Sequence, residues 1–320
     1  MVAVTPWHKL GYDIFAHHTI WNQEEVEKIM PNDTVYISIL RNPVDLFESL
    51  YSYAELNRIY QVDLEEFALA DKTSGPLSQR ASKHLGQNQM LFDFGLATSL
   101  LQNMTAIKEK IDEIDRKFDL IMIAERFDES MVLLKDLLCW NTSDVTSFKQ
   151  NARQSGKKTQ LSSEAKVKLQ DWLKGDQMLY DYFNKKFDDK VKHLGSRLVE
   201  AEVENLRSIT DSIKKHCSAS AEKSSDLRGV LKPYGKIVIG YHVNMNDTEC
   251  LDFARAENPF TDTLRNIQKI RASTKYKLNK TNHFNNSLDS RLAKAKLLAH
   301  EKVQNQRRIR TRLQSSNNIT

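Results

Sequence analysis

The chain has 320 residues, 40% hydrophobic and 28% charged, which is enough for one sizeable α/β domain with a buried core and does not require a second domain. Its 47 basic and 42 acidic side chains give a formal net charge of +5, which favours anionic ligands but names no partner. Cys139, Cys217 and Cys250 lie far apart without a CxxC pair, so a zinc ribbon or thioredoxin-type site has no support and at most one disulfide can form.

A strand, a tight turn and a helix are predicted near the start of the chain. Residues 34–40 are rich in β-branched and aromatic residues and are too short for a helix, which predicts a buried strand. Asn42 is a suitable N-cap and Pro43 suits the first position of a helix. Apolar residues recur at helical spacing from Leu46 to Ala54, so the helix follows the strand directly.

A second unit of the same kind follows. Residues 119–125 predict a strand, with a charged helical run at 106–118 before it and an apolar-faced helix at 128–140 after it. Strands that alternate with helices favour a parallel sheet flanked by helices, so we expect an α/β fold. Residues 162–217 are predicted to be helical throughout, which makes the C-terminal half largely helical.

The composition changes after Cys217. Residues 218–235 are rich in Ser, Lys and Gly and are interpreted as a linker or surface loop, and residues 237–241 as a short strand. Residues 272–320 carry many Lys, Arg, Asn and Gln side chains and few large apolar ones. This composition is typical of a loose basic helix or of disorder.

Arg41 and Ser49 are the strongest local signal for chemistry. An Arg at the carboxyl end of a buried strand, beside the first turn of a helix, joins a fork of donors to the positive end of the helix dipole, which suits a phosphate. Ser49 comes seven residues after Asn42, close to two helical turns, so its hydroxyl can face the same anion. In the alternative interpretation, Arg41 pairs with an acidic neighbour and Ser49 is a small packing residue.

These residues belong to segments that resemble a known enzyme family. The string Leu-Arg-Asn-Pro at 40–43, followed by Leu-Phe-Glu-Ser at 46–49, is similar to the galactose 3-O-sulfotransferase family, most of all to its galactosylceramide-sulfating branch. Similar segments follow in the family's order at residues 92–95, 127–130, 132–140 and 148–153. The likeness extends from about Tyr12 to Cys217 and returns weakly at 239–241.

The resemblance implies a P-loop-NTPase-like sulfotransferase fold and a domain organisation. It implies a partial sulfotransferase domain at 1–217, incomplete at the N-terminus, a C-terminal extension at 218–271 and a basic, poorly ordered tail at 272–320. Family members carry a strand and a Lys-Thr-Gly/Ala-Ser type loop around the 5′-phosphosulfate of the donor. Neither this loop nor an apolar stretch of roughly 20 residues for a membrane anchor is found, so we expect an N-terminally truncated member.

The resemblance also implies the sulfate donor 3′-phosphoadenosine-5′-phosphosulfate (PAPS) and no metal. Arg41 and Ser49 match the family's Arg and Ser that hold the 3′-phosphate. Arg153 is a further candidate for the donor phosphate or an anionic acceptor, with a solvated surface charge as the alternative.

A histidine pair supplies the candidate base. Sulfuryl transfer needs a group that takes the proton from the acceptor hydroxyl, and imidazole is suited to this. His18 precedes Arg41 by 23 residues, a spacing similar to that of many PAPS-dependent sulfotransferases, so His18 is the expected base. His17 is an orienting neighbour or the alternative base, and a partly buried structural pair is the competing interpretation.

The expected reaction is PAPS-dependent transfer of a sulfuryl group to the 3-hydroxyl of terminal galactose, in a glycolipid such as galactosylceramide or in a glycan. The resemblance implies a single-pass type II Golgi membrane protein with a luminal catalytic domain, and homodimerisation is one option. Seven Asn-x-Ser/Thr sequons lean towards a secretory compartment. An inactive relative that acts as a binding or regulatory protein is the alternative. A nucleic-acid partner is not expected, because the basic tail lacks interleaved aromatics.

Overall fold

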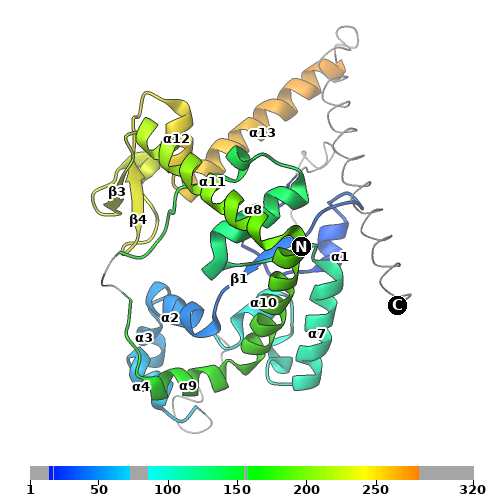
Figure 1. Cartoon of the computed structure of the whole chain (residues 1–320), viewed down its shortest axis with the longest axis vertical. Helices are drawn as coiled ribbons and strands as arrows, with labels where there is room; N and C mark the ends of the chain where they lie inside the picture. The colour runs from blue at the N-terminus through cyan, green and yellow to red at the C-terminus, as the bar shows by residue number, and fades with distance from the viewer. Residues whose placement is uncertain (1–13, 17, 73–85, 155, 157, 281–320) are drawn as a thin grey trace.

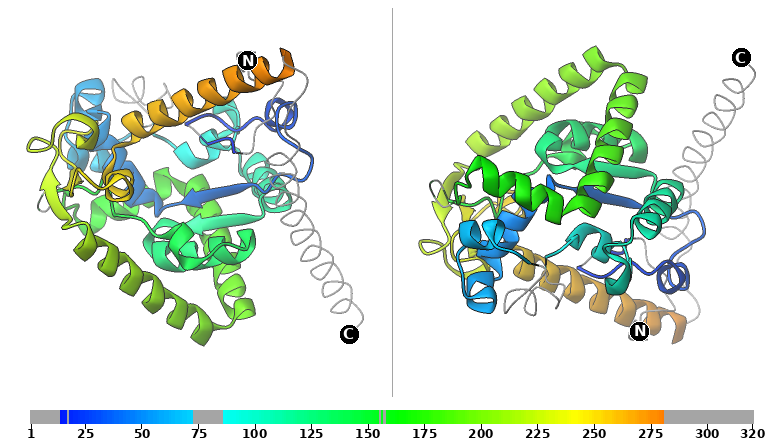
Figure 2. Two further views of the ribbon diagram at one scale, coloured as in Figure 1. Left: turned by 90° about the horizontal axis from the view of Figure 1, so that it is seen from above. Right: turned by 90° about the horizontal axis from the view of Figure 1, so that it is seen from below.

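The computed structural model describes residues 14–16, 18–72, 86–154, 156 and 158–280, and within 272–280 the backbone only. Two strands form its centre, β1 (Ile37–Leu40) and β2 (Leu120–Ile123). They pair in parallel, with Ile37 opposite Leu120 and Leu40 opposite Ile123, and Figure 2 shows them side by side among the helices. Both predicted strands and their parallel arrangement are confirmed.

The expectation that the first strand is buried is only partly right. Every residue of β2 is buried, but in β1 the side chains of Ile37 and Ile39 are 39% and 43% exposed. Within the described part of the chain, β1 pairs with β2 alone. One row of its alternating side chains is therefore uncovered there, which the strand's own apolar sequence does not reveal.

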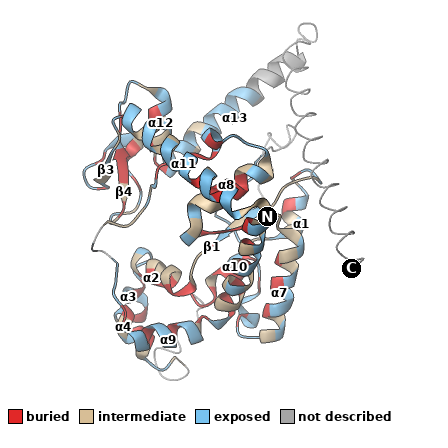
Figure 3. Cartoon of the chain, in the orientation of Figure 1, coloured by how far each residue is buried: buried red, intermediate tan, exposed pale blue. Residues whose placement is uncertain are grey.

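Each strand is followed by a helix, as predicted. Asn42 caps α2 (Pro43–Tyr53) by accepting hydrogen bonds from the backbone N–H groups of Val44 and Asp45. The second strand lies between α7 (Met104–Lys117) and α8 (Phe127–Leu138), whose apolar faces join the main core. Figure 3 marks the buried residues of these helices in red.

The long segment after residue 162 is helical, which confirms the prediction, but it is divided into three helices. These are α9 (Ser163–Trp172), α10 (Lys174–Leu194) and α11 (Ser196–His216). Gly195 separates the last two with a φ of +102°, which an L side chain rarely adopts, so the chain changes direction there. α10 packs its apolar residues against β2 and the core.

Short helices complete the α/β part of the molecule. A second core cluster joins α2 and α9 through Phe47, Tyr60, Phe67 and Trp172, whose rings meet edge-on or tilted. The short elements are α1 (Gln23–Glu27), α3 (Leu56–Tyr60), α4 (Leu64–Leu69), α6 (Gln89–Asp93), and the 3-10 turns η2 (Thr98–Leu100), η3 (Ala124–Arg126) and η4 (Thr142–Val145).

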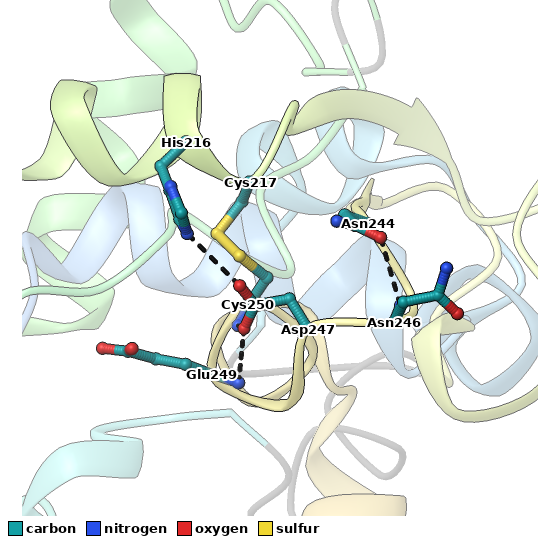
Figure 4. The surroundings of a disulfide bond; sticks show 7 residues. All are labelled: His216, Cys217, Asn244, Asn246, Asp247, Glu249 and Cys250. Atoms are coloured by element: carbon teal, nitrogen blue, oxygen red, sulfur yellow. Dashed lines mark hydrogen bonds and ion pairs between the residues drawn. A yellow bond between two sulfur atoms is a disulfide. The ribbon is translucent and has the colours of Figure 1, made fainter.

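Residues 218–259, called here the C-terminal unit, fold around a disulfide between Cys217 and Cys250 (Figure 4). The interpretation of 218–235 as a linker or surface loop is wrong. The segment contains β3 (Ser220–Lys223), which pairs antiparallel with the predicted strand β4 (Ile239–His242), and it buries Leu227 and Leu231. The other elements are η5 (Gly229–Leu231), α12 (Thr248–Ala254) and the start of α13 (Glu257–Lys280).

The helix α13 leaves this unit as a long rod (Figure 1). It runs through residue 272, where the sequence analysis starts the basic tail, and residues 281–320 of that tail lie outside the described residues. Among the helices that the structure describes, none combines the length and apolar character needed to cross a membrane.

Candidate functional site

A cavity of about 880 Å³ lies at the carboxyl ends of the two parallel strands. Ligands of open α/β sheets commonly bind at this edge. The cavity has two walls. The first wall comes from the strand ends and α2, and includes Arg41, Asp45, Ser49, Tyr53 and Glu125. The second comes from the C-terminal unit, and includes Lys232, Tyr234, Ile237, Val238, Glu257 and Asn258.

The residues predicted from the sequence meet in this cavity. His18, Arg41, Ser49 and Arg153 all line it, although they are spread over 136 positions of the chain. His17 lies outside the described residues.

Arg41 is the first residue after β1 and its side chain is half-buried at the cavity. The Asn42 turn that carries it is fixed by Glu125, at the end of β2, whose carboxylate accepts from the Asn42 N–H (2.8 Å) and from the Tyr180 hydroxyl (3.2 Å). Burial raises the pKa of Tyr180 to about 12, so this hydroxyl remains a donor at neutral pH.

The guanidinium of Arg41 lines the cavity without a partner among the described residues. Within the described residues it makes no ion pair or hydrogen bond, and neither does the Ser49 hydroxyl. Among the described residues Arg41 therefore does not pair with an acidic neighbour, contrary to the alternative interpretation. The side-chain donors of Arg41 and Ser49 fit an anion of phosphate type. The first backbone N–H groups of α2 are already bonded, those of Val44 and Asp45 to the Asn42 side chain.

Arg153 has a different environment. Its guanidinium forms an ion pair with Glu48 of α2, whose side chain is 2% exposed and also accepts from the Thr159 N–H (2.8 Å). The side chain of Arg153 is 16% exposed, so the interpretation as a solvated surface charge is wrong. The ion pair with Glu48 neutralises much of the charge of Arg153 and joins this cavity-lining residue to α2. Lys158 adds a second connection to α2 through Asp45 (2.7 Å).

The segment that carries His18 is held against α6. The Trp21 N–H donates to the Asp93 carbonyl (2.7 Å), and Gly95 approaches so closely that a Cβ there would lie 2.4 Å from the Trp21 carbonyl oxygen. Gly95 also has a φ of +84°, so two constraints require glycine. The family-like segment at 92–95 thus positions the residues that follow His18.

His18 itself points into solvent at the cavity. Its side chain is 91% exposed, and its Nε2 lies 3.6 Å from Glu257 Oε1 at the start of α13. The competing interpretation of a partly buried structural histidine does not hold for His18. A carboxylate beside one ring nitrogen favours the tautomer that carries the proton on that nitrogen.

Two lysines that the sequence analysis did not single out also line the cavity. Lys149 and Lys232 are exposed and, within the described residues, unpaired. Lys149 lies in the family-like segment at 148–153, so the resemblance was a signal from which it could have been identified. Lys232 lies in the stretch interpreted as a linker and had none. With Arg41, three cations that make no ion pair among the described residues line this cavity. The carboxylates that also line it have other partners, since Asp45 pairs with Lys158 and Glu257 lies beside His18. The three cations therefore favour a ligand with more than one negative group.

A cluster of possible metal ligands lies away from the cavity, at the disulfide (Figure 4). His216, Asp247 and Cys250 have ligand atoms within 4.8 Å of one another. The Cys250 sulfur is bonded to Cys217, and His216 Nε2 lies 3.2 Å from Asp247 Oδ2. With its thiolate consumed by the disulfide, this cluster does not offer a metal site.

Comparison with known proteins agrees with the motifs at this cavity. A family model described as galactose-3-O-sulfotransferase matches residues 3–249. The chain belongs to this family. It is 36% identical over 233 residues to galactose-3-O-sulfotransferase 2 of Sus scrofa, covering 70% of this chain and 58% of the relative. It is 34% identical over 213 residues to human galactosylceramide sulfotransferase, covering 64% and 50%.

The relatives are longer than this chain and are named for different acceptors. The chain spans about three fifths of the length of the galactose-3-O-sulfotransferase 2 relatives, 58% for the pig protein and 61% for the mouse protein. Identities of 36% and 34% to relatives named for different acceptors favour neither acceptor. No solved structure matches the chain significantly.

Proposed function

We propose that this sulfotransferase transfers a sulfuryl group from PAPS to the 3-hydroxyl of a terminal galactose, in a glycolipid such as galactosylceramide or in a glycan. The observation that carries the proposal is the unpaired Arg41 at the carboxyl end of β1, in the same cavity as His18. Family membership supports sulfuryl transfer to galactose, and the arrangement of the cavity supports an anionic nucleotide donor.

The residues of the first wall fit the donor. Arg41 and the Ser49 hydroxyl would hold its 3′-phosphate, near the positive end of the α2 dipole, and Lys149 and Lys232 would offset its remaining charge. When bound, PAPS supplies the sulfuryl group and departs as adenosine 3′,5′-bisphosphate. Three cations that make no ion pair among the described residues match a donor with several negative charges better than they match a neutral sugar.

His18 would act as the base. As the acceptor oxygen forms its bond to sulfur and the bond from sulfur to the phosphate oxygen breaks, the hydroxyl proton moves to the imidazole. Glu257, 3.6 Å from Nε2, favours the tautomer with its proton on that nitrogen, which leaves Nδ1 as the acceptor. Glu257 thus serves as a positioning residue for His18.

The setting we propose is the Golgi lumen, with the full-length protein associated with the membrane. The disulfide between Cys217 and Cys250 supports an oxidising compartment. The asparagines of the four sequons within the described surface, Asn32, Asn103, Asn141 and Asn246, are all exposed, as N-glycosylation requires.

The direct test is incubation of the chain with PAPS carrying labelled sulfate and a β-galactoside, followed by identification of the sulfated position. The proposal expects label on the galactose 3-oxygen. Binding of adenosine 3′,5′-bisphosphate, measured by calorimetry, provides a readout that does not depend on turnover. Absence of both binding and labelled product would refute the proposal.

A further inference from the structure

The second wall of the cavity has a defined architecture of its own. The C-terminal unit is closed by the disulfide between Cys217 and Cys250, and the Ala256 N–H near its end donates to the Val230 carbonyl in its interior (2.8 Å). The strand pairing of β3 with β4 and a buried cluster around Leu231 and Tyr241 fix the backbone between them. The backbone positions from which its residues face the cavity are therefore fixed by packing within the unit.

Tyr234 is the most exposed large side chain on that wall. It is 81% exposed, and within the described residues it makes no hydrogen bond or ring contact. Its neighbours are fixed, because the buried Ser224 hydroxyl donates to the Pro233 carbonyl (3.1 Å) and Gly235 lies against Val238. A single exposed tyrosine is ordinary on a protein surface. This one is held on a fixed loop at the rim of a cavity that also contains His18.

The chemistry of a galactoside matches this position. One face of a galactopyranose ring presents C–H groups, while the hydroxyls, including the 3-hydroxyl, point outward from the ring edge. A tyrosine offers an apolar ring face with a polar tip, so it can cover the C–H face without occupying the reacting hydroxyl. His18, the proposed base for that hydroxyl, lies 3.6 Å from Glu257 of the same wall.

We infer that Tyr234 is the platform for the terminal galactose of the acceptor, and that the C-terminal unit is the acceptor-recognising wall of the site. This inference rests on the proposed function. The competing ligand for the ring is the adenine of the donor. The position of Tyr234 argues against adenine, because the donor residues Arg41 and Ser49 lie on the first wall. On that wall α2 presents an exposed tyrosine of its own, Tyr53 (63% exposed), one turn after Ser49.

The test uses the full chain and two probes. Methyl β-D-galactopyranoside is titrated by NMR, and adenosine 3′,5′-bisphosphate by calorimetry. We expect Tyr234→Ala to weaken galactoside binding by roughly three- to tenfold, the scale of one aromatic contact, and to leave the bisphosphate affinity unchanged. Tyr234→Phe keeps the ring and should bind the galactoside like the parent. Tyr53→Ala, the matched control from the other wall, should also leave galactoside binding unchanged.

Four results would overturn the inference. Tyr234→Ala could bind the galactoside like the parent, or it could lose bisphosphate affinity instead, which would assign the ring to adenine. A parent chain that binds the bisphosphate but no galactoside would overturn this inference alone. A parent that binds neither probe would refute the proposed function and this inference with it. Because Tyr234 is exposed, the alanine variant should fold, and an unchanged melting temperature verifies this.

Discussion

Replacement of Arg41 by alanine tests the donor wall most directly. The guanidinium lines the cavity and makes no ion pair or hydrogen bond within the described residues. Its removal therefore leaves no buried acid without a partner, and the turn that carries it stays fixed by the bond from the Asn42 N–H to Glu125 (2.8 Å). Any loss of ligand affinity can then be assigned to the lost contact with the ligand.

The size of that loss follows from the type of contact. A hydrogen bond to a charged group contributes about 1.5–3 kcal/mol, and a guanidinium can make two to one phosphate. Solvent reaches the half-buried side chain, which places the expected loss near the lower end of this range. We expect about 2 kcal/mol, or roughly 30-fold weaker binding of adenosine 3′,5′-bisphosphate.

Calorimetry of the parent and the Arg41→Ala variant measures this difference. Arg58→Ala is the matched control, because it removes the same charge from an exposed side chain on α3 that pairs with Glu55 and does not line the cavity. The control should bind the bisphosphate like the parent. If Arg41→Ala bound it as tightly as Arg58→Ala, Arg41 would not be a phosphate ligand.

Three further predictions concern the base, a buried acid and the disulfide. His18→Ala should lower turnover on a β-galactoside by roughly two to four powers of ten without changing bisphosphate affinity, whereas His193→Ala, outside the cavity lining, should do neither. Burial raises the pKa of Asp176 to about 7, so the folded state holds this proton more tightly than the unfolded state. As the pH rises from roughly 4 to 7, the free energy of unfolding should therefore fall by up to about 1.4 kcal/mol per pH unit. Urea unfolding of Asp176→Asn should show a smaller decrease over this pH range than the parent, and an unchanged decrease would contradict a raised pKa for Asp176. Replacing Cys217 and Cys250 together by alanine should lower the free energy of unfolding by about 3 kcal/mol, and urea unfolding that showed no loss would contradict a stabilising disulfide.

The first wall of the cavity was predictable because its signals are local. A β-branched run, an N-cap and a proline at the first helical position lie within a few residues of one another, and each has its own physical preference. The structure has the strand at Ile37–Leu40, the cap at Asn42 and the helix at Pro43–Tyr53. The position of Arg41 follows from these elements alone.

The second wall was not predictable from local signals. Ser-Ala-Glu-Lys at 220–223 has neither strand propensity nor apolar alternation, and it becomes β3 because His242 and its neighbours pair with it. Glu48 is a similar case within the first wall. A charged residue on the buried face of α2 makes sense only with Arg153, which is 105 residues away. Such partners cannot be identified from spacing.

Residues 151–154 connect the two walls of the cavity, whose separation must be fixed if donor and acceptor are to react. Residues 151–154 run between the walls and pair with β4 and the residues before it, through the Ile239 N–H to the Ala152 carbonyl (2.8 Å) and the Gln154 N–H to the Ile237 carbonyl (2.9 Å). The same segment is fastened to α2 by the ion pair of Arg153 with the buried Glu48. Arg153 therefore connects the helix that carries Ser49 to the unit that carries Tyr234. Because the two sites share this connection, a change at Glu48 should alter donor and acceptor binding together, unlike a change on either wall alone.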